Sequence, residues 1–83
     1  MYYQLYYDKE KFIIEVKALK SQFKSDDFLN KLVQLGDDEV WEFNSCYKFS
    51  KNKKVLKQEA LDMKNGWIKE LTDKIEQIET IKI

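Results

Sequence analysis

The spacing of apolar residues in the first part of the chain predicts a strand followed by a helix. In residues 2–7, apolar and aromatic side chains alternate around Leu5, and tyrosine favours strands, so a strand is expected there. Residues 9–24 carry apolar side chains at helical spacing, and Asp8 is placed to cap that helix. A strand through residues 11–19 is the competing interpretation, because apolar residues alternate there as well. The helical stripe is longer, so we expect the helix.

The remainder of the chain predicts two more helices and a second strand. A short helix over about residues 26–35 is expected between a Ser25 cap and a Gly36 stop. Residues 40–49 predict one strand with one aromatic and one mostly polar face. A long helix is expected over 53–79 as the cover of that aromatic face.

Two points about the end of the chain stay open in the sequence. Gly66 lies inside the long helix and is a poor helix former, so the helix continues, bends or breaks there. Residues 80–83 alternate, which fits either a short strand or a frayed end.

The predicted fold class is therefore α+β, in a single small domain over residues 1–83. We expect a sheet of two or three strands packed on helices, in the order β-α-α-β-α with an optional final β, and a long C-terminal helix. A core of this size contributes only about 3–5 kcal/mol of net stability. Oligomerisation or partner binding is therefore expected to add stability.

The composition excludes the commonest catalytic centres. The chain has no His and a single Cys, so it lacks His-based triads, Cys–His pairs, intramolecular disulfides and the usual zinc ligand sets. The two glycines, Gly36 and Gly66, stand too far apart to form a phosphate-binding loop. We expect a protein that is not an enzyme, with no metal and no cofactor.

The chain is expected to reside in the cytoplasm. No apolar run approaches the roughly 18–20 residues that cross a bilayer, so no membrane segment is expected. A lone Cys46 is typical of a reducing compartment. If the protein is viral, this compartment is the cytoplasm of the host cell.

Charged and aromatic residues indicate a protein-binding surface. Tyr2 and Tyr6 are expected to face outward from the first strand, as rigid amphipathic side chains that anchor interfaces do. Residues 37–42 form an acidic corner suited to a basic partner, although a solvated turn explains the same charges. The candidate partner-binding residues are Tyr2, Tyr6, Asp37, Asp38, Glu39 and Glu42.

A lysine-rich stretch supports an alternative function. Five lysines within ten residues suit contact with a phosphate backbone, and Tyr47 and Phe49 beside them suit stacking on bases. These lysines are Lys48, Lys51, Lys53, Lys54 and Lys57. The chain has 15 basic and 15 acidic residues and no Arg, which argues against sequence-specific DNA reading and also allows a merely solubilising loop.

The second half of the long helix supports a further alternative, a homo-oligomer. Its apolar residues at 68, 71, 75 and 78 have the a/d spacing of a coiled-coil seam. This stripe either covers the sheet or pairs with a second copy.

One short fragment resembles a known family. Lys64-Asn65-Gly66-Trp67 together with Thr80-Ile81-Lys82 is similar to the C-terminal part of small type II anti-CRISPR inhibitors. The resemblance covers only these positions, lacks the acidic stretch of that family and transfers no functional residue. It implies a phage or mobile-element inhibitor that binds a host protein, which is the sharpest form of the expected function.

Overall fold

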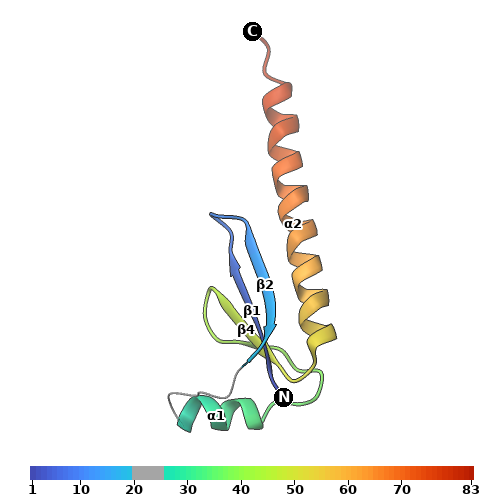
Figure 1. Cartoon of the computed structure of the whole chain (residues 1–83). Helices are drawn as coiled ribbons and strands as arrows, with labels where there is room; N and C mark the ends of the chain where they lie inside the picture. Colours follow the sequence, from blue (N-terminus) through green and yellow to red (C-terminus); the bar gives the residue numbers. More distant parts are fainter. Residues whose placement is uncertain (20–25) are drawn as a thin grey trace.

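The computed structural model describes residues 1–19 and 26–83 and shows a four-stranded antiparallel sheet beside a long protruding helix (Figure 1). The elements are β1 (Tyr3–Asp8), β2 (Ile13–Ala18), α1 (Asp26–Val33), β3 (Trp41–Glu42), β4 (Tyr47–Ser50) and α2 (Lys53–Glu79). The strands lie in the order β2-β1-β4-β3. The α+β class and the long C-terminal helix are confirmed. The predicted order is wrong, because the described residues hold four strands and two helices.

The helix predicted over residues 9–24 is replaced by a hairpin. Strand β2 pairs with β1 along its whole length, from Tyr3 opposite Ala18 to Asp8 opposite Ile13. Asp8 caps the hairpin turn instead of a helix, since its carboxylate accepts from the backbone N–H groups of Glu10 and Lys11 at 3.0 and 3.2 Å. The β-branched residues of this segment favour a strand once a partner strand is available. Residues 20–24 of the predicted helix, and the Ser25 cap, lie outside the described residues.

The single strand predicted over residues 40–49 is also wrong, because a turn divides it. The side chain of Asn44 accepts from the backbone N–H groups of Cys46 and Tyr47 at 2.8 and 3.0 Å. Such a bond lets asparagine close a turn locally. Across this turn, the N–H of Phe43 donates to the carbonyl of Tyr47 at 3.1 Å. The segment therefore folds back as the β3–β4 hairpin.

Helix α2 covers the opposite face of the sheet from the one predicted. Leu5 on β1 stands opposite Lys48 on β4, and the Lys48 side chain reaches Glu59 on α2. Leu5 and Leu56 are fully buried between the sheet and α2. Because side chains alternate along a strand, Phe49 points to the other face. The mixed Leu5–Lys48 face, and not the aromatic one, therefore receives the long helix.

The aromatic face is closed at one end by α1, which crosses the base of the molecule (Figure 1). Phe49 is 4% exposed and lies with Leu32 and Leu35 in a buried cluster. Phe28 of α1 meets Phe49 edge-on, with ring centroids 5.0 Å apart. Helix α1 ends at Val33, before the predicted residue 35. The core thus has two parts, one on each side of the sheet.

Helix α2 is continuous through Gly66. It begins after Asn52, whose side chain accepts from the backbone N–H of Lys54 at 2.9 Å. It ends at Glu79, and residues 80–83 form no strand. Every residue from 71 to 83 is exposed, so the last part of α2 extends beyond the sheet. This overhang gives the molecule a long axis of 59 Å.

Replacing Gly66 with alanine is expected to stabilise the fold by about 0.5–1 kcal/mol. Nothing lies within 4 Å of a Cβ added at this position, so the gain in helix propensity meets no steric cost. Urea unfolding followed by circular dichroism measures the change. Asn65→Ala, at the exposed neighbouring position, is the control and is expected to give a smaller gain. A destabilised Gly66→Ala variant would contradict the continuous helix.

Candidate interaction surface

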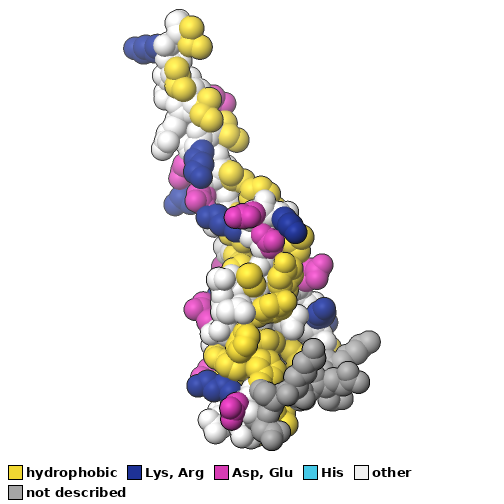
Figure 2. Space-filling view, turned by 90° about the vertical axis from the view of Figure 1, so that its left-hand side faces the viewer, with side chains coloured by type: hydrophobic (Ala, Val, Ile, Leu, Met, Phe, Trp, Pro, Cys, Tyr) yellow, Lys and Arg dark blue, Asp and Glu magenta, His cyan; other side chains and the backbone are white. Residues whose placement is uncertain are grey.

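A row of exposed apolar side chains follows α2. We call Leu61, Ile68, Leu71, Ile75 and Ile78 the exposed stripe; their exposed fractions run from 41% to 65%. In Figure 2, hydrophobic side chains continue along the protruding part of the molecule to its tip. Scattered exposed leucines are ordinary on protein surfaces, but a contiguous apolar patch marks an interaction site.

The exposed stripe is separate from the face by which α2 contacts the sheet. Leu56, Ala60, Met63 and Trp67, which recur every three or four residues, are buried or half-buried on the sheet side. At 100° per residue, the mean directions of the two sets of side chains lie roughly 80° apart around the helix axis. Ile75 and Ile78 lie past the end of the sheet, and Ile68 and Leu71 border the sheet only where they line a groove with Ile14, so most of the stripe does not cover the sheet, which was one of its two expected roles.

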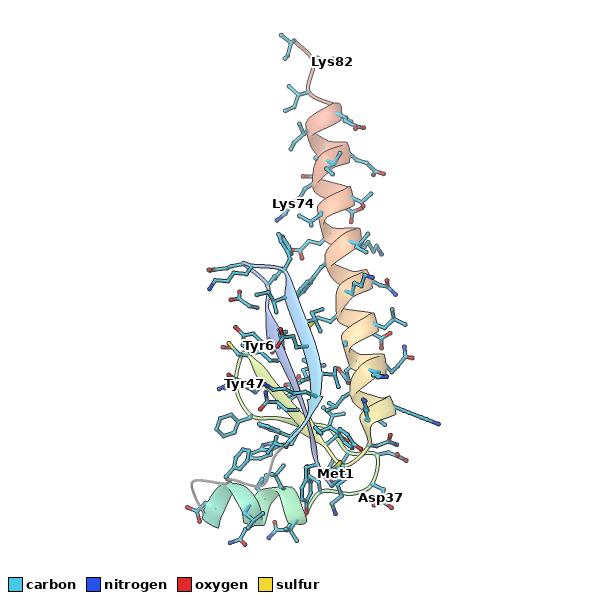
Figure 3. The ribbon with its side chains drawn as sticks, viewed as in Figure 1. Met1, Tyr6, Asp37, Tyr47, Lys74 and Lys82 are labelled. Carbon is cyan, nitrogen blue, oxygen red and sulfur yellow. The ribbon has the colours of Figure 1, made fainter. Side chains whose placement is uncertain are left out.

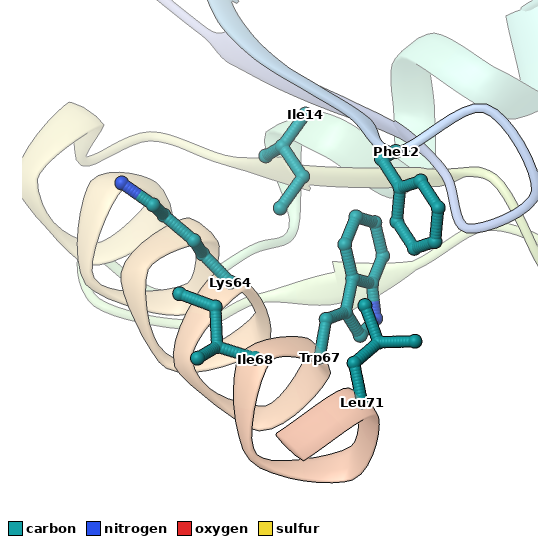
Figure 4. Close-up of a pocket in the computed structure, with 6 residues that line it drawn as sticks. All are labelled: Phe12, Ile14, Lys64, Trp67, Ile68 and Leu71. Atoms are coloured by element: carbon teal, nitrogen blue, oxygen red, sulfur yellow. The ribbon is translucent and has the colours of Figure 1, made fainter. Parts of the chain in front are cut away.

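A groove lies where the exposed stripe meets the β1–β2 hairpin. It has a volume of about 350 Å³, and its walls come from the end of the hairpin and from α2 (Figure 4). The lining residues are Phe12, Ile14, Lys64, Trp67, Ile68 and Leu71. The groove is mainly apolar and open to solvent, which suits an apolar side chain or helix rather than a charged metabolite.

The hairpin is fastened to α2 beside this groove. The ammonium of Lys9 lies 2.7 Å from the carboxylate of Glu70, and this hydrogen bond holds the pKa of Glu70 below its usual range. The ring of Phe12 meets Trp67 edge-on at 6.1 Å. Phe12 has a φ of 54°, a left-handed conformation that is strained for a bulky residue. The side chain of Phe12 is 58% exposed at the groove, so its burial does not compensate for the backbone strain.

The two tyrosines predicted to bind a partner lie on the aromatic face. Tyr2 packs against the buried cluster around Phe49, and Tyr6 lies beside Tyr47 with ring centroids 5.3 Å apart. Figure 3 shows Tyr6 and Tyr47 together on the side of the sheet away from α2. Both tyrosines are half-buried. Partial burial and the nearby carboxylate of Asp8 raise the pKa of Tyr6.

The structure separates the members of the predicted acidic corner. Asp38 accepts from the side-chain amide of Asn52 at 2.7 Å, and Glu39 accepts from the N–H of Gly36 at 3.0 Å. Glu42 pairs with Lys48 at 3.1 Å. Asp37, labelled in Figure 3, lines a hollow that also contains lysines. Local structure therefore uses three of these four carboxylates.

The predicted phosphate-binding lysines are likewise mixed with acids. Lys48 is only 12% exposed and lies 3.1 Å from both Glu42 and Glu59. The Lys51 ammonium donates to the carbonyl of Val33 at 3.2 Å. Lys51, Lys53 and Lys54 share their hollow with Asp37, and Lys57 is exposed on α2. Phe49, expected to stack on bases, is buried. These residues do not form a purely basic surface.

The Lys48 ion pairs give the fold a pH dependence above pH 10. Burial alone would lower the pKa of the Lys48 ammonium, but hydrogen bonds to Glu59 and Glu42 outweigh it, and the pKa is raised from 10.5. A raised folded-state pKa gives stability that is complete below the unfolded-state pKa and is lost as the pH rises through the folded-state pKa.

The free energy of unfolding of the native chain is therefore expected to fall as the pH rises above about 10.5, and less steeply for Lys48→Met. Urea unfolding at several pH values up to 12 measures both slopes. Lys69→Met, on an exposed lysine of α2, should keep the native slope. Equal alkaline slopes for Lys48→Met and the native chain would count against the ion-pair explanation.

Sequence reasoning missed two parts of this surface. It omitted Leu61, which stands seven residues before Ile68 and extends the same heptad pattern. It also missed Phe12 as part of the groove, because that position depends on the β1–β2 hairpin, and the segment was predicted to be helical.

The fold and the exposed stripe define a small α+β protein with a protruding amphipathic helix. No family model, curated protein or solved structure matches the chain. Within residues 1–19 and 26–83, no helix is long and apolar enough to span a membrane. The same residues contain no group of three or more acidic or cysteine side chains placed to hold a metal ion.

Proposed function

We propose that this chain is a non-catalytic protein-interaction module that binds through the exposed stripe of α2. The single observation that carries the proposal is the row of five large apolar residues, each at least 41% exposed, on a helix that extends beyond the sheet. Apolar surface of this kind is driven out of water when a partner covers it. The sheet and the Lys9–Glu70 ion pair hold the helix in place for that contact.

Other features of the chain contribute less to this proposal. Partner binding by the residues expected from the sequence, such as Tyr6 and Glu42, stays a prediction. In the structure, Tyr6 contacts Tyr47 and Glu42 pairs with Lys48 within the same chain. The source in a phage or mobile element, the host-protein target and the cytoplasmic location are likewise proposals. They rest on the expectations from composition and on the resemblance of the fragment around Gly66 to small type II anti-CRISPR inhibitors.

The nucleic-acid alternative has little support from the geometry. A phosphate-binding surface needs several free cations on one side of the molecule. Here Lys48 is enclosed by two glutamates, and the neighbouring lysines share their surface with Asp37. We expect no binding of labelled single- or double-stranded DNA even at low salt. Binding whose affinity falls steeply as salt is raised would restore this alternative.

Site-specific photocrosslinking tests the proposed function. The photoreactive residue p-benzoylphenylalanine replaces Ile75 on the exposed stripe or, as the matched control, Asp73 on the far side of α2. Both positions are exposed and lie beyond the sheet. After irradiation of cells that produce the protein, we expect a covalent protein adduct from position 75 and little from position 73. No adduct, or equal adducts from both positions, would contradict binding through the stripe.

A further inference from the structure

We infer that the partner of the exposed stripe is a second copy of this chain, paired through α2 as a short, parallel, two-stranded coiled coil. The inference rests on the proposed function and deepens it by naming the occupant. Four observations carry it: the heptad pattern of α2, the charges that flank it, the area it exposes and the direction in which it points.

The exposed stripe follows a heptad repeat, and the heptad that begins at Ile68 has the residues typical of a parallel dimer. Leu61, Ile68 and Ile75 stand seven residues apart at one core position, the a position. Leu71 and Ile78 stand at the other, the d position, three residues after Ile68 and Ile75. Ile68 at a with Leu71 at d is the combination that favours parallel dimers, whereas Ile75 with Ile78 places isoleucine at both positions, which favours three or four strands. The layers from Ile68 to Ile78 are apolar throughout.

Lys64 marks the end of the continuous seam nearest the sheet. It occupies the d position one heptad before Leu71 and lines the groove near Ile14. In a parallel pair the two Lys64 side chains face each other, and long lysine stems carry their ammonium groups outward to water. The pairing therefore depends on Ile68 and the residues after it, most of which lie on the overhang.

The charges beside the seam select the parallel direction. Lys74 stands at the g position and Glu79 at the e position of the following heptad. In a parallel pair these positions of opposite chains are neighbours, so two Lys74–Glu79 contacts of opposite charge form across the seam. In an antiparallel pair that aligns Ile68 with Ile78, g positions face each other, and Lys74 meets Lys74 of the second copy.

The area that the stripe exposes is slightly below that of a stable dimer interface. Taking roughly 190 Å² for a whole Leu or Ile, the five exposed fractions correspond to roughly 500 Å² on each copy. Two copies then bury roughly 1,000 Å² before Phe12 and the flanking residues are counted. Stable interfaces begin near about 1,200 Å² in total. We therefore expect a reversible dimer that dissociates on dilution.

The sheet leaves room for the second helix. Because the stripe points roughly 80° away from the sheet-facing side of α2, the partner helix approaches beside the sheet and not through it. On that side lies the groove, where Phe12 stands next to Trp67 (Figure 4). The exposed ring of Phe12 can then contact the partner helix, which gives a reason for keeping a bulky residue in a strained turn.

Sedimentation equilibrium on the purified chain tests the pairing. The mass is expected to rise from 10.1 kDa towards twice that value as the concentration increases from roughly 1 to 100 µM. Ile75→Asp places an unpaired carboxylate from each copy in the seam and should weaken the dimer at least about 100-fold. Val33→Asp is the matched control, because Val33 and Ile75 are both 55% exposed but Val33 lies on α1. A native mass that stays at 10.1 kDa at 100 µM would overturn the inference.

Disulfide trapping tests the direction. In a Cys46→Ser background, Ile78→Cys brings two sulfur atoms together only if the helices are parallel, because an antiparallel pair separates the two copies of residue 78. We expect a disulfide-linked dimer on a non-reducing gel after mild oxidation, and none from Asp73→Cys on the far side of α2. A dimeric sample that forms no bond through residue 78 would overturn the parallel arrangement.

These experiments distinguish the two proposals. A monomeric chain that still crosslinks to a different protein from position 75 overturns the homodimer and leaves the interaction module standing. A monomeric chain with no adduct from position 75 overturns both.

Discussion

Leu5→Ala is expected to cost about 2–5 kcal/mol, which is enough to leave much of the protein unfolded at room temperature. Leu5 is fully buried on β1, in the part of the core between the sheet and α2. Removing most of its side chain leaves a cavity that neither β1 nor α2 can close, because β1 is held between β2 and β4. Urea unfolding monitored by circular dichroism at one fixed protein concentration measures the effect. The helical signal of Leu5→Ala should be lost at lower urea than that of the native chain.

The control for this substitution is Val33→Ala. Val33 is 55% exposed on α1, so its truncation should change the free energy of unfolding by less than about 0.5 kcal/mol. If Leu5→Ala were as mild as Val33→Ala, the sheet and α2 would not share a packed core at this position.

Phe49→Ala is expected to cost about 3–5 kcal/mol through the other part of the core. Phe49 is 4% exposed, and its ring lies 5.0 Å from Phe28, 5.6 Å from Trp41 and 6.4 Å from Tyr47, centroid to centroid. Its removal takes away the ring nearest to Phe28 of α1, which also contacts Trp41 at 5.4 Å and Phe43 at 5.5 Å. Trp41 adjoins the lost ring and becomes exposed to water when the protein unfolds, which shifts tryptophan fluorescence to longer wavelength. In urea titrations of Phe49→Ala, this shift should occur at a much lower midpoint than in the native chain.

Phe43→Ala is the matched control for this second substitution. Phe43 belongs to the same cluster, with its ring 5.9 Å from that of Phe49, but it is 49% exposed. Its loss should cost no more than about 1–1.5 kcal/mol. Equal costs for the two substitutions would show that burial of Phe49 is not what holds α1 in place.

The elements with one dominant pattern were predictable from the sequence. Helix α2 has long-range helical periodicity and a capping residue before it, and its observed bounds of Lys53–Glu79 match the predicted 53–79. Strand β1 has a dense run of tyrosines, and its observed bounds differ from the predicted 2–7 by one residue at each end. In both segments local propensity and tertiary packing favour the same structure.

The segment after Asp8 shows why the remainder was not predictable. Residues 11–19 fit both a helical stripe and the alternation of Phe12, Ile14, Val16 and Ala18, and only the presence of β1 alongside makes the alternation the better choice. The Asp8 carboxylate signals a turn as readily as a helix cap, because both use the same bonds to backbone N–H groups. Asn44 lies inside a run of strand-forming residues and fits either a continuous strand or a turn. Which of the two structures forms depends on contacts with residues distant in sequence.

The candidate surface was likewise predictable only where it depends on a local pattern. The a/d spacing of residues 68–78 was visible in the sequence, because it is a local pattern on one helix. Whether those residues faced the sheet was not visible, since this depends on how α2 is rotated about its own axis. In the structure Leu56 is buried and Glu59 pairs with Lys48 of β4, so this side of α2 faces the sheet.

The first residue lies at the base of the molecule and the last at its far tip (Figure 1). A reporter joined after Ile83 would be carried on a rod well clear of the globular part, and parallel pairing would deliver two reporters to one point in space. Split fluorescent halves attached there are expected to reassemble in living cells if the helices pair in parallel, and Ile75→Asp in both fusions is expected to reduce that signal. The elongated shape thus turns an assembly question into a difference in light output between two fusions.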